Sequence, residues 1–225
     1  MSQPTYLYGL HVANILLENH AENIITIYLQ DSFVKVNNPK INQIVNLANQ
    51  YGIKIQYFAK QKLDQFALSQ QHQGVVVQCK GNTVLKAKND DQLKAYHEEL
   101  LEQDSAHKFF ILILDGIQDP HNLGACIRSA AAMGVDCVIL PQNNSVGITS
   151  TVCKTSAGTA LTLPIFQVVN LARTIESGAV SMKSCSTLSR KRITSSTKVG
   201  WLFHSSKYSR FSELRQHTAV RLPPR

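Results

Sequence analysis

The chain has 225 residues, of which 44% are hydrophobic, so it can bury a core as one large or two small domains. No apolar run approaches the roughly 20 residues that a membrane span needs. The N-terminus lacks the basic and apolar regions of a secretory signal, and we expect a cytoplasmic protein. The cysteines are widely spaced without a CxxC pair, which favours reduced thiols over disulfides and gives no support for a metal site. They are Cys79, Cys126, Cys137, Cys153 and Cys185.

The formal net charge of +8 is concentrated at the end of the chain. Residues 177–225 contain ten lysines and arginines against one acid, Glu213, whereas residues 1–176 contain 13 bases and 14 acids. A high pI often indicates a nucleic-acid-binding surface. Here that inference cannot be applied to the body of the chain.

Residues 1–80 alternate between helical and strand patterns, which predicts a small α/β domain. Pro39 near the first turn and Gly52 at the end delimit one of the helices. The predicted helices are 8–18, 38–52 and 60–68, and the predicted strands are 24–29, 54–58 and 74–79.

Residues 81–106 are interpreted as a polar linker followed by a helix over 91–103. A second domain, residues 107–176, opens with the apolar run 109–115, typical of a strand buried on both faces of a parallel sheet. Its other predicted elements are helices at 122–133, 149–158 and 170–176, a strand at 136–140 and a short strand near 163–169.

Residues 177–225 differ in character from everything before them. They hold 11 serines, few acids and no clean helical or alternating period, which predicts a disordered basic tail. A shift of reading frame near residue 176 would produce the same composition. Both explanations stay open.

The segment after the 109–115 strand concentrates groups that can handle a polar ligand. In open α/β sheets, ligands bind in the crevice beyond the carboxyl ends of the strands. Asp119 followed by Pro120 is a helix start signal, and this structural role is favoured for both. His121 has the pKa range of a general base, although a single loop histidine is more often only exposed.

The helix that follows carries three more candidates. Asn122 would lie near its start, with its amide free for a ligand or a cap. Gly124 and Arg128 are four residues apart and so share a helix face. A helical glycine costs about 1 kcal/mol relative to alanine, so Gly124 indicates close approach of either a substrate or a packing neighbour. Arg128 must reach solvent or an anionic partner. The spacing is not GxGxxG, so a dinucleotide site is not supported.

The sequence DPHNLGACIRSAAAMGV resembles the first signature motif, N-x-G-x-x-x-R, of the SpoU/TrmH branch of the SPOUT methyltransferases. YGLHVANILLE and HQGVVVQ resemble the start and end of that family's substrate-binding domain, and KTSAGTALTLPIFQVVNLARTIE resembles a later segment. The resemblance covers about residues 6–176. Within the branch it is strongest to bacterial enzymes that methylate a guanosine 2′-hydroxyl in 23S ribosomal RNA.

This resemblance implies an N-terminal RNA-binding domain, a flexible linker and a SPOUT-type parallel α/β catalytic domain with a C-terminal knot. It also implies S-adenosyl-L-methionine as cofactor, 23S rRNA as substrate and a homodimer. It assigns catalysis to Asn122 and Arg128, which we expect to converge at the strand-end crevice around a ribose. From the chemistry of the loop itself, we expect Asp119, His121 and Gly124 to contribute to substrate binding. A site built around a 2′-hydroxyl suits RNA, since DNA lacks that group.

Three departures from the family pattern stand out. The family's glutamate falls near Leu161, an apolar residue. The cofactor loop GxEGxG and the closing S-x-N-x-S-x-A segment are both absent, so no cofactor-binding residue can be assigned and the knot is expected to be missing or disrupted. The prediction is therefore an RNA 2′-O-methyltransferase that is impaired in this copy; the alternative is a non-catalytic RNA-binding protein of the same descent.

Overall fold

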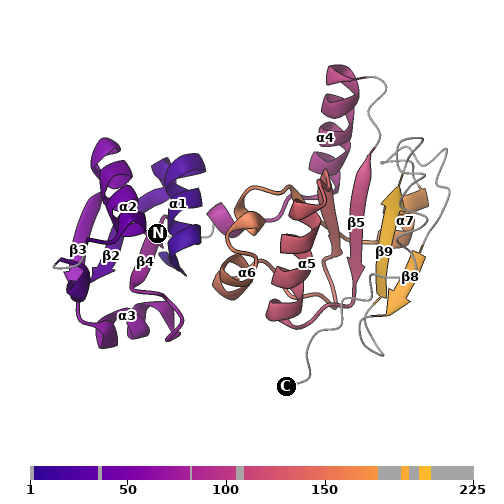
Figure 1. The fold of residues 1–225 in the computed structure, drawn as a ribbon. Coiled ribbons are helices and arrows are strands. Elements are labelled where there is room, and N and C mark those ends of the chain that lie inside the picture. Colours follow the sequence, from indigo (N-terminus) through magenta and orange to yellow (C-terminus); the bar gives the residue numbers. More distant parts are fainter. Residues whose placement is uncertain are drawn as a thin grey trace.

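The structure, a computed structural model, describes residues 3–34, 37–81, 83–104 and 109–176, together with two strands at 189–192 and 198–203. These residues form two α/β lobes, each built on its own sheet (Figure 1). The strand orders are β1-β4-β2-β3 in the first sheet and β7-β6-β5-β9-β8 in the second. The predicted α/β fold class is confirmed.

The first sheet carries helices on both faces. Strands β2 and β3 are parallel, and β4 runs antiparallel to its neighbours β1 and β2. Alternation along β4 divides the core, because Val75 and Val77 pack in the cluster with α1 and α2 whereas Val76 packs with α3. The elements are β1 (Thr5–Tyr8), α1 (Leu10–Asn19), β2 (Ile24–Gln30), α2 (Pro39–Gln50), β3 (Lys54–Phe58), α3 (Lys60–Ala67) and β4 (Val75–Cys79), with short 3-10 helices η1 (Ala21–Asn23) and η2 (Asp31–Val34).

The segment between the lobes is fixed to the second sheet, which differs from the expected flexible linker. After η3 (Thr83–Leu85), Lys88 forms a parallel bridge with Phe166: its N–H donates to Ile165 O at 2.9 Å and its carbonyl accepts from Gln167 N at 2.7 Å. Helix α4 (Asp90–Gln103) then begins with a capping box at Asn89. Backbone pairing along β7 thus restrains the linker.

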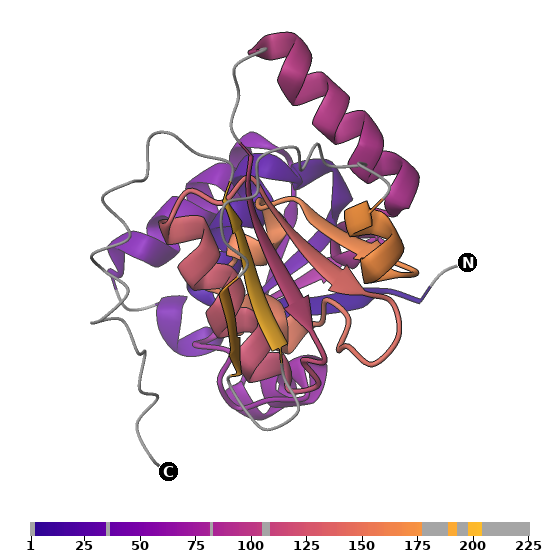
Figure 2. The ribbon, with the colours of Figure 1, turned by 90° about the vertical axis from the view of Figure 1, so that its right-hand side faces the viewer.

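The second sheet contains the predicted parallel strands. Its core strand β5 packs against α4 on one side and against α5 and α6 on the other (Figure 2). Strands β5, β6 and β7 are parallel in the order β7-β6-β5. The elements are β5 (Phe110–Asp115), α5 (Pro120–Ala132), β6 (Cys137–Pro141), α6 (Ser150–Thr155), η4 (Thr159–Leu161), β7 (Ile165–Val168) and α7 (Leu171–Glu176).

Two further strands lie in the segment for which no regular element was predicted. Strand β9 (Lys198–Phe203) pairs antiparallel with β5, and β8 (Ser189–Arg192) pairs with β9. The physical reason is the free edge of β5, whose unpaired N–H and C=O groups accept another strand. The run KVGWLF holds four apolar residues but no strict alternation, and serine-rich segments flank it, so the sequence gives no clear strand signal there. The predictions of a disordered tail and a disrupted knot otherwise fall outside the described residues.

The two lobes share one hydrophobic core across α1, α6 and η4. Helices α1 and α6 lie where the lobes meet (Figure 1). Gly158 has a φ of 88°, and a Cβ there would lie 2.5 Å from Ile15 Cδ1 of α1. The ring nitrogen His20 Nε2 lies 3.0 Å from Leu161 O, and Lys154 Nζ donates to Gln73 Oε1. No helix in the described part of the chain has the length and apolarity to cross a membrane.

Candidate functional site

The loops that follow the three parallel strands meet at one edge of the second sheet. Strand β5 ends at Asp115, and its loop is tied to the loop after β6, because Val146 N donates to Ile117 O at 2.8 Å. The β6 loop is tied in turn to β7, since Gln142 N donates to Val168 O at 2.8 Å. Carboxyl ends of parallel strands must lie together, and the residues of the motif begin at this edge.

Asp119 caps α5, as the sequence indicated. Its Oδ1 accepts from His121 N at 3.0 Å, and its carbonyl accepts from Leu123 N at 3.0 Å. Pro120 occupies the first helical position, where its missing N–H costs nothing. The carboxylate is therefore committed to starting the helix, and its role in substrate binding stays a prediction.

Gly124 allows close contact between α5 and α6. A Cβ at this position would lie 2.6 Å from Thr155 Cβ, 3.0 Å from Val152 O and 3.1 Å from Ser156 N. Two of these neighbours are backbone atoms, which cannot move aside as a flexible side chain can. The sequence left open whether a packing neighbour or a substrate approaches Gly124, and the structure supplies the packing neighbour. Contact with substrate stays a prediction.

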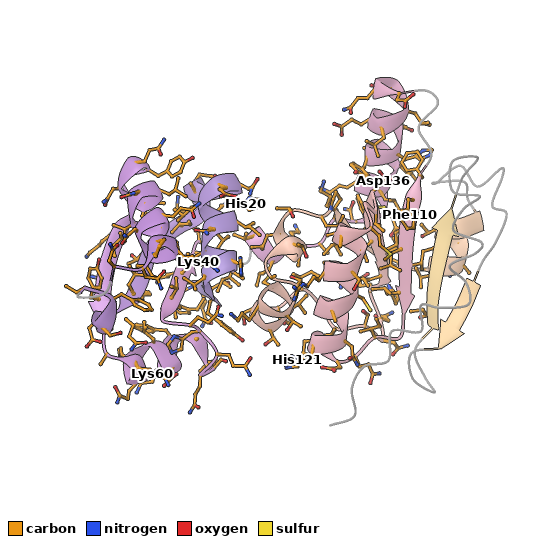
Figure 3. All side chains as sticks on the ribbon, viewed as in Figure 1. His20, Lys40, Lys60, Phe110, His121 and Asp136 are labelled. Atoms are coloured by element: carbon orange, nitrogen blue, oxygen red, sulfur yellow. The ribbon has the colours of Figure 1, made fainter. Side chains whose placement is uncertain are left out.

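His121 lies at the N-terminal end of α5, where it meets α6 (Figure 3). Its Nδ1 is 3.4 Å from Thr155 Oγ1, and that hydroxyl donates to Thr151 O at 2.8 Å. Because the single hydroxyl proton is already donated, Thr155 Oγ1 can act only as an acceptor toward His121. The His121 ring is exposed, and its Nε2 has no partner among the described residues. The sequence analysis missed Thr155, whose only signal is its place in KTSAG.

Asn122 and Arg128 do not converge on one face of α5. Six helical residues separate them by about 120° around the axis and about 9 Å along it. Asn122 is half-buried and Arg128 exposed, and among the described residues neither side chain has a hydrogen bond or ion pair. Arg128 instead shares an exposed stripe with His121, seven residues earlier. Convergence around a ribose is therefore not provided by this helix alone.

The cysteines near the site are not activated nucleophiles. Burial raises the pKa of the Cys153 and Cys137 thiols to about 12, and it also raises the pKa of Cys126. Reactive thiols need a lowered pKa, so a covalent route through them has no support. In the described part of the chain, no group of three or more histidine, cysteine and acidic side chains could hold a metal ion.

Two described positions lack the groups expected at a site for the methionine-derived cofactor. Leu161, where the family has a carboxylate, is only 8% exposed and packs in the core shared by the lobes. Among the strand-end loops, Gly147 faces open space instead of forming a cradle that a side chain would fill. The groups that the structure does provide lie on α5 and α6.

Two family models match the chain. The SpoU rRNA Methylase family matches residues 109–206, and the model described as RNA 2′-O ribose methyltransferase substrate binding matches residues 6–85. The first match continues 30 residues past the end of the resemblance drawn from the sequence.

Curated relatives are similar over most of the chain. The 23S rRNA (guanosine-2′-O-)-methyltransferase RlmB of Shewanella oneidensis is 39% identical over 175 residues, covering 78% of this chain and 66% of the relative. The protein of the same name from Acinetobacter baylyi is 38% identical over 175 residues with the same coverage. The chain thus spans just under two thirds of the length of these relatives.

Solved structures support the fold. An AdoMet-bound rRNA methyltransferase from Sinorhizobium meliloti superposes with a TM-score of 0.53 at 18% identity, covering 78% of this chain and 59% of that one. An RNA 2′-O ribose methyltransferase superposes with a TM-score of 0.55 at 16% identity and the same coverage. Identities this low establish the shared architecture only.

Proposed function

The chain belongs to the SpoU family of rRNA methylases, and on that basis we propose that it acts on the 2′-hydroxyl of a guanosine in 23S ribosomal RNA, with S-adenosyl-L-methionine as methyl donor. The observation that carries this proposal is the N-x-G-x-x-x-R motif on α5, at the strand-end edge of a parallel sheet. The relatives that are similar to this chain over 175 residues are named for this reaction.

The chemistry requires a 2′-oxygen positioned for in-line attack and a group that takes its proton. The cofactor supplies an electrophilic methyl group. On this chain, the exposed His121 ring is suited to take the proton, and the permanently charged Arg128 is suited to stabilise the developing alkoxide. Asn122, with its amide free of described partners, would orient the ribose.

We propose a homodimer, and the exposure of Arg128 supports this proposal. The other residues of the stripe that Arg128 shares with His121 are small: Ala125, Ser129 and Ala132. Next to the stripe, Met133 is 40% exposed. A second copy seated on this stripe would cover it and bring further groups toward the guanidinium. The proposed ribosomal RNA substrate supports a proposed location in the cytoplasm.

The alternative is a non-catalytic RNA-binding protein, which is favoured by one observation. Leu161 stands where the family has a carboxylate, and its side chain is buried in the core shared by the lobes. In that case the chain would retain the RNA-binding lobe and lose methyl transfer.

Transfer of labelled methyl from S-adenosylmethionine to 23S rRNA tests the proposal. Arg128→Ala is expected to abolish transfer while changing the free energy of unfolding by no more than about 0.5 kcal/mol, because the exposed side chain has no described partner. Arg173→Ala, which removes an exposed arginine from α7, is the matched control and should leave transfer unchanged. Transfer that survives Arg128→Ala would remove this residue from the mechanism. RNA binding without any transfer by the unmodified chain would favour the alternative.

A further inference from the structure

Four strands of the first sheet contribute one polar row on the face that α3 flanks. Tyr6 is opposite Gln78, Gln78 is opposite Thr26, and Thr26 is opposite Lys54. Directly opposed residues in neighbouring strands project to the same side of a sheet. We call these four residues, Tyr6, Gln78, Thr26 and Lys54, the Tyr6 row.

Helix α3 covers the row next to it and leaves most of the Tyr6 row accessible. Leu63 and Ala67 of α3 pack on Tyr8, Val76 and Tyr28, which form the neighbouring row. In the Tyr6 row, Lys54 is exposed, Tyr6 and Gln78 are half-buried, and Thr26 is buried. The opposite face of the sheet is closed by α1 and α2 and by the shared core.

The polar groups of the row are held in place by hydrogen bonds. Tyr28 Oη donates to Gln78 Oε1 at 2.7 Å, and Gln78 Nε2 lies 3.5 Å from Tyr6 Oη as a donor. Gln78 retains a second amide hydrogen, and no described residue accepts from the Tyr6 hydroxyl. The row therefore keeps two donors without a described acceptor, the second amide hydrogen of Gln78 and the Tyr6 hydroxyl, and the acceptor atoms on nucleobase edges can pair with them.

An aromatic stack borders the row, and exposed lysines lie in the row and on α3. Phe66 stacks on Tyr6, with ring centroids 5.5 Å apart and an interplanar angle of 5°, and on Tyr28 with centroids 4.8 Å apart. Lys62 Nζ lies 5.2 Å from the centre of the Phe66 ring. Lys60 and Lys62 of α3 are exposed, as is Lys54 of the row itself. Aromatic surfaces beside cations are the usual means of binding single-stranded nucleic acid without strict sequence preference.

We propose that the Tyr6 row, together with Phe66 and the lysines of α3, binds unpaired nucleotides of the RNA substrate. Bases lie against the Tyr6–Phe66 stack and hydrogen bond to Gln78 and the Tyr6 hydroxyl, while Lys54, Lys60 and Lys62 neutralise phosphates. This inference rests on the proposed function, because it assumes an RNA substrate. The substrate-binding family model covers this lobe but does not single out a face.

The test is binding of a fluorescein-labelled, unstructured RNA of about 15 nucleotides to the full chain, followed by anisotropy at several salt concentrations. Lys54→Gln should weaken binding three- to ten-fold and lower the slope of log K against log salt by about 0.7. Its matched control is Lys40→Gln on α2, on the opposite face of the sheet from α3 and Lys60 (Figure 3). Tyr6→Phe, which keeps the ring, should weaken binding about five-fold, whereas the control Tyr51→Phe should not.

The outcomes are distinguishable from those of the proposed function. Equal losses of RNA affinity in the row variants and in the controls would overturn the inference, as would no RNA binding by the unmodified chain. The face would then serve a protein partner or a second copy of the chain, and sedimentation velocity detects such an assembly. Row-dependent RNA binding without methyl transfer would sustain this inference and contradict only the catalytic proposal. A preference for duplex RNA of equal length would also overturn it, because a duplex hides its base faces.

Discussion

Gly124→Ala tests whether the motif glycine is fixed by helix packing. In an isolated helix, the change would stabilise by about 1 kcal/mol, because alanine is the better helix former. In this fold the new Cβ would lie 2.6 Å from Thr155 Cβ and 3.0 Å from the backbone oxygen of Val152. Overpacking of this kind costs about 1–3 kcal/mol, and the upper part of that range applies because two of the three neighbours are backbone atoms. We expect a net loss of about 1–2 kcal/mol.

Urea unfolding followed by circular dichroism measures this loss, and the thermal midpoint should fall by about 2–8 °C for a chain of this size. Gly147→Ala is the matched control: no atom lies within 4 Å of its added Cβ, so it should be neutral or stabilise by about 0.4–1 kcal/mol through the unfolded state. A Gly124→Ala protein as stable as the unmodified chain would refute the packing argument. The glycine would then have to be explained by a ligand.

The remaining predictions concern the thiols, the cofactor and position 161. Cys79, Cys137 and Cys153, with pKa values raised to about 12 by burial, should resist iodoacetamide at pH 8 until urea unfolds the chain; rapid labelling in native buffer, located by peptide mass spectrometry, would contradict this. Calorimetry should detect S-adenosylmethionine binding weaker than micromolar, as expected for an impaired methyltransferase; micromolar affinity would show that the cofactor site is complete, and no binding at all would favour the non-catalytic alternative. Leu161→Glu should lower the free energy of unfolding by about 2–5 kcal/mol because it buries a carboxylate, whereas Thr162→Glu at the exposed neighbour should have little effect.

Local signals predicted much of the fold because they depend on neighbours in sequence. The cap at Asp119 and the apolar run of β5 were both read correctly, as was the start of α2 at Pro39. Strand β1 was missed because four residues are too few to show a period. The hairpin of β8 and β9 was missed because it depends on the free edge of β5, which is distant in sequence.

The candidate site could be predicted only in part, for a similar reason. Sequence reasoning selected His121 and Arg128 but could not find Thr155, which reaches His121 only because α6 folds back on α5. It also expected Asn122 and Arg128 to converge, although the helical repeat that the same reasoning used separates them by about 120°. Residue spacing along one helix settles which side chains share a face, while contacts between elements require the tertiary structure.

Folding and ligand binding make different demands on α5. Asp119 and Gly124 are accounted for by the helix start and by α6, and their contacts explain why those residue types occur. Arg128 and Asn122 have no described partner, so the stability of the chain gains nothing from their polar groups. A guanidinium has five donors, and an amide has both donors and acceptors. The helix therefore carries binding capacity that its own fold does not use, and an anionic, hydroxyl-bearing ligand such as a ribose-phosphate chain has the complementary chemistry.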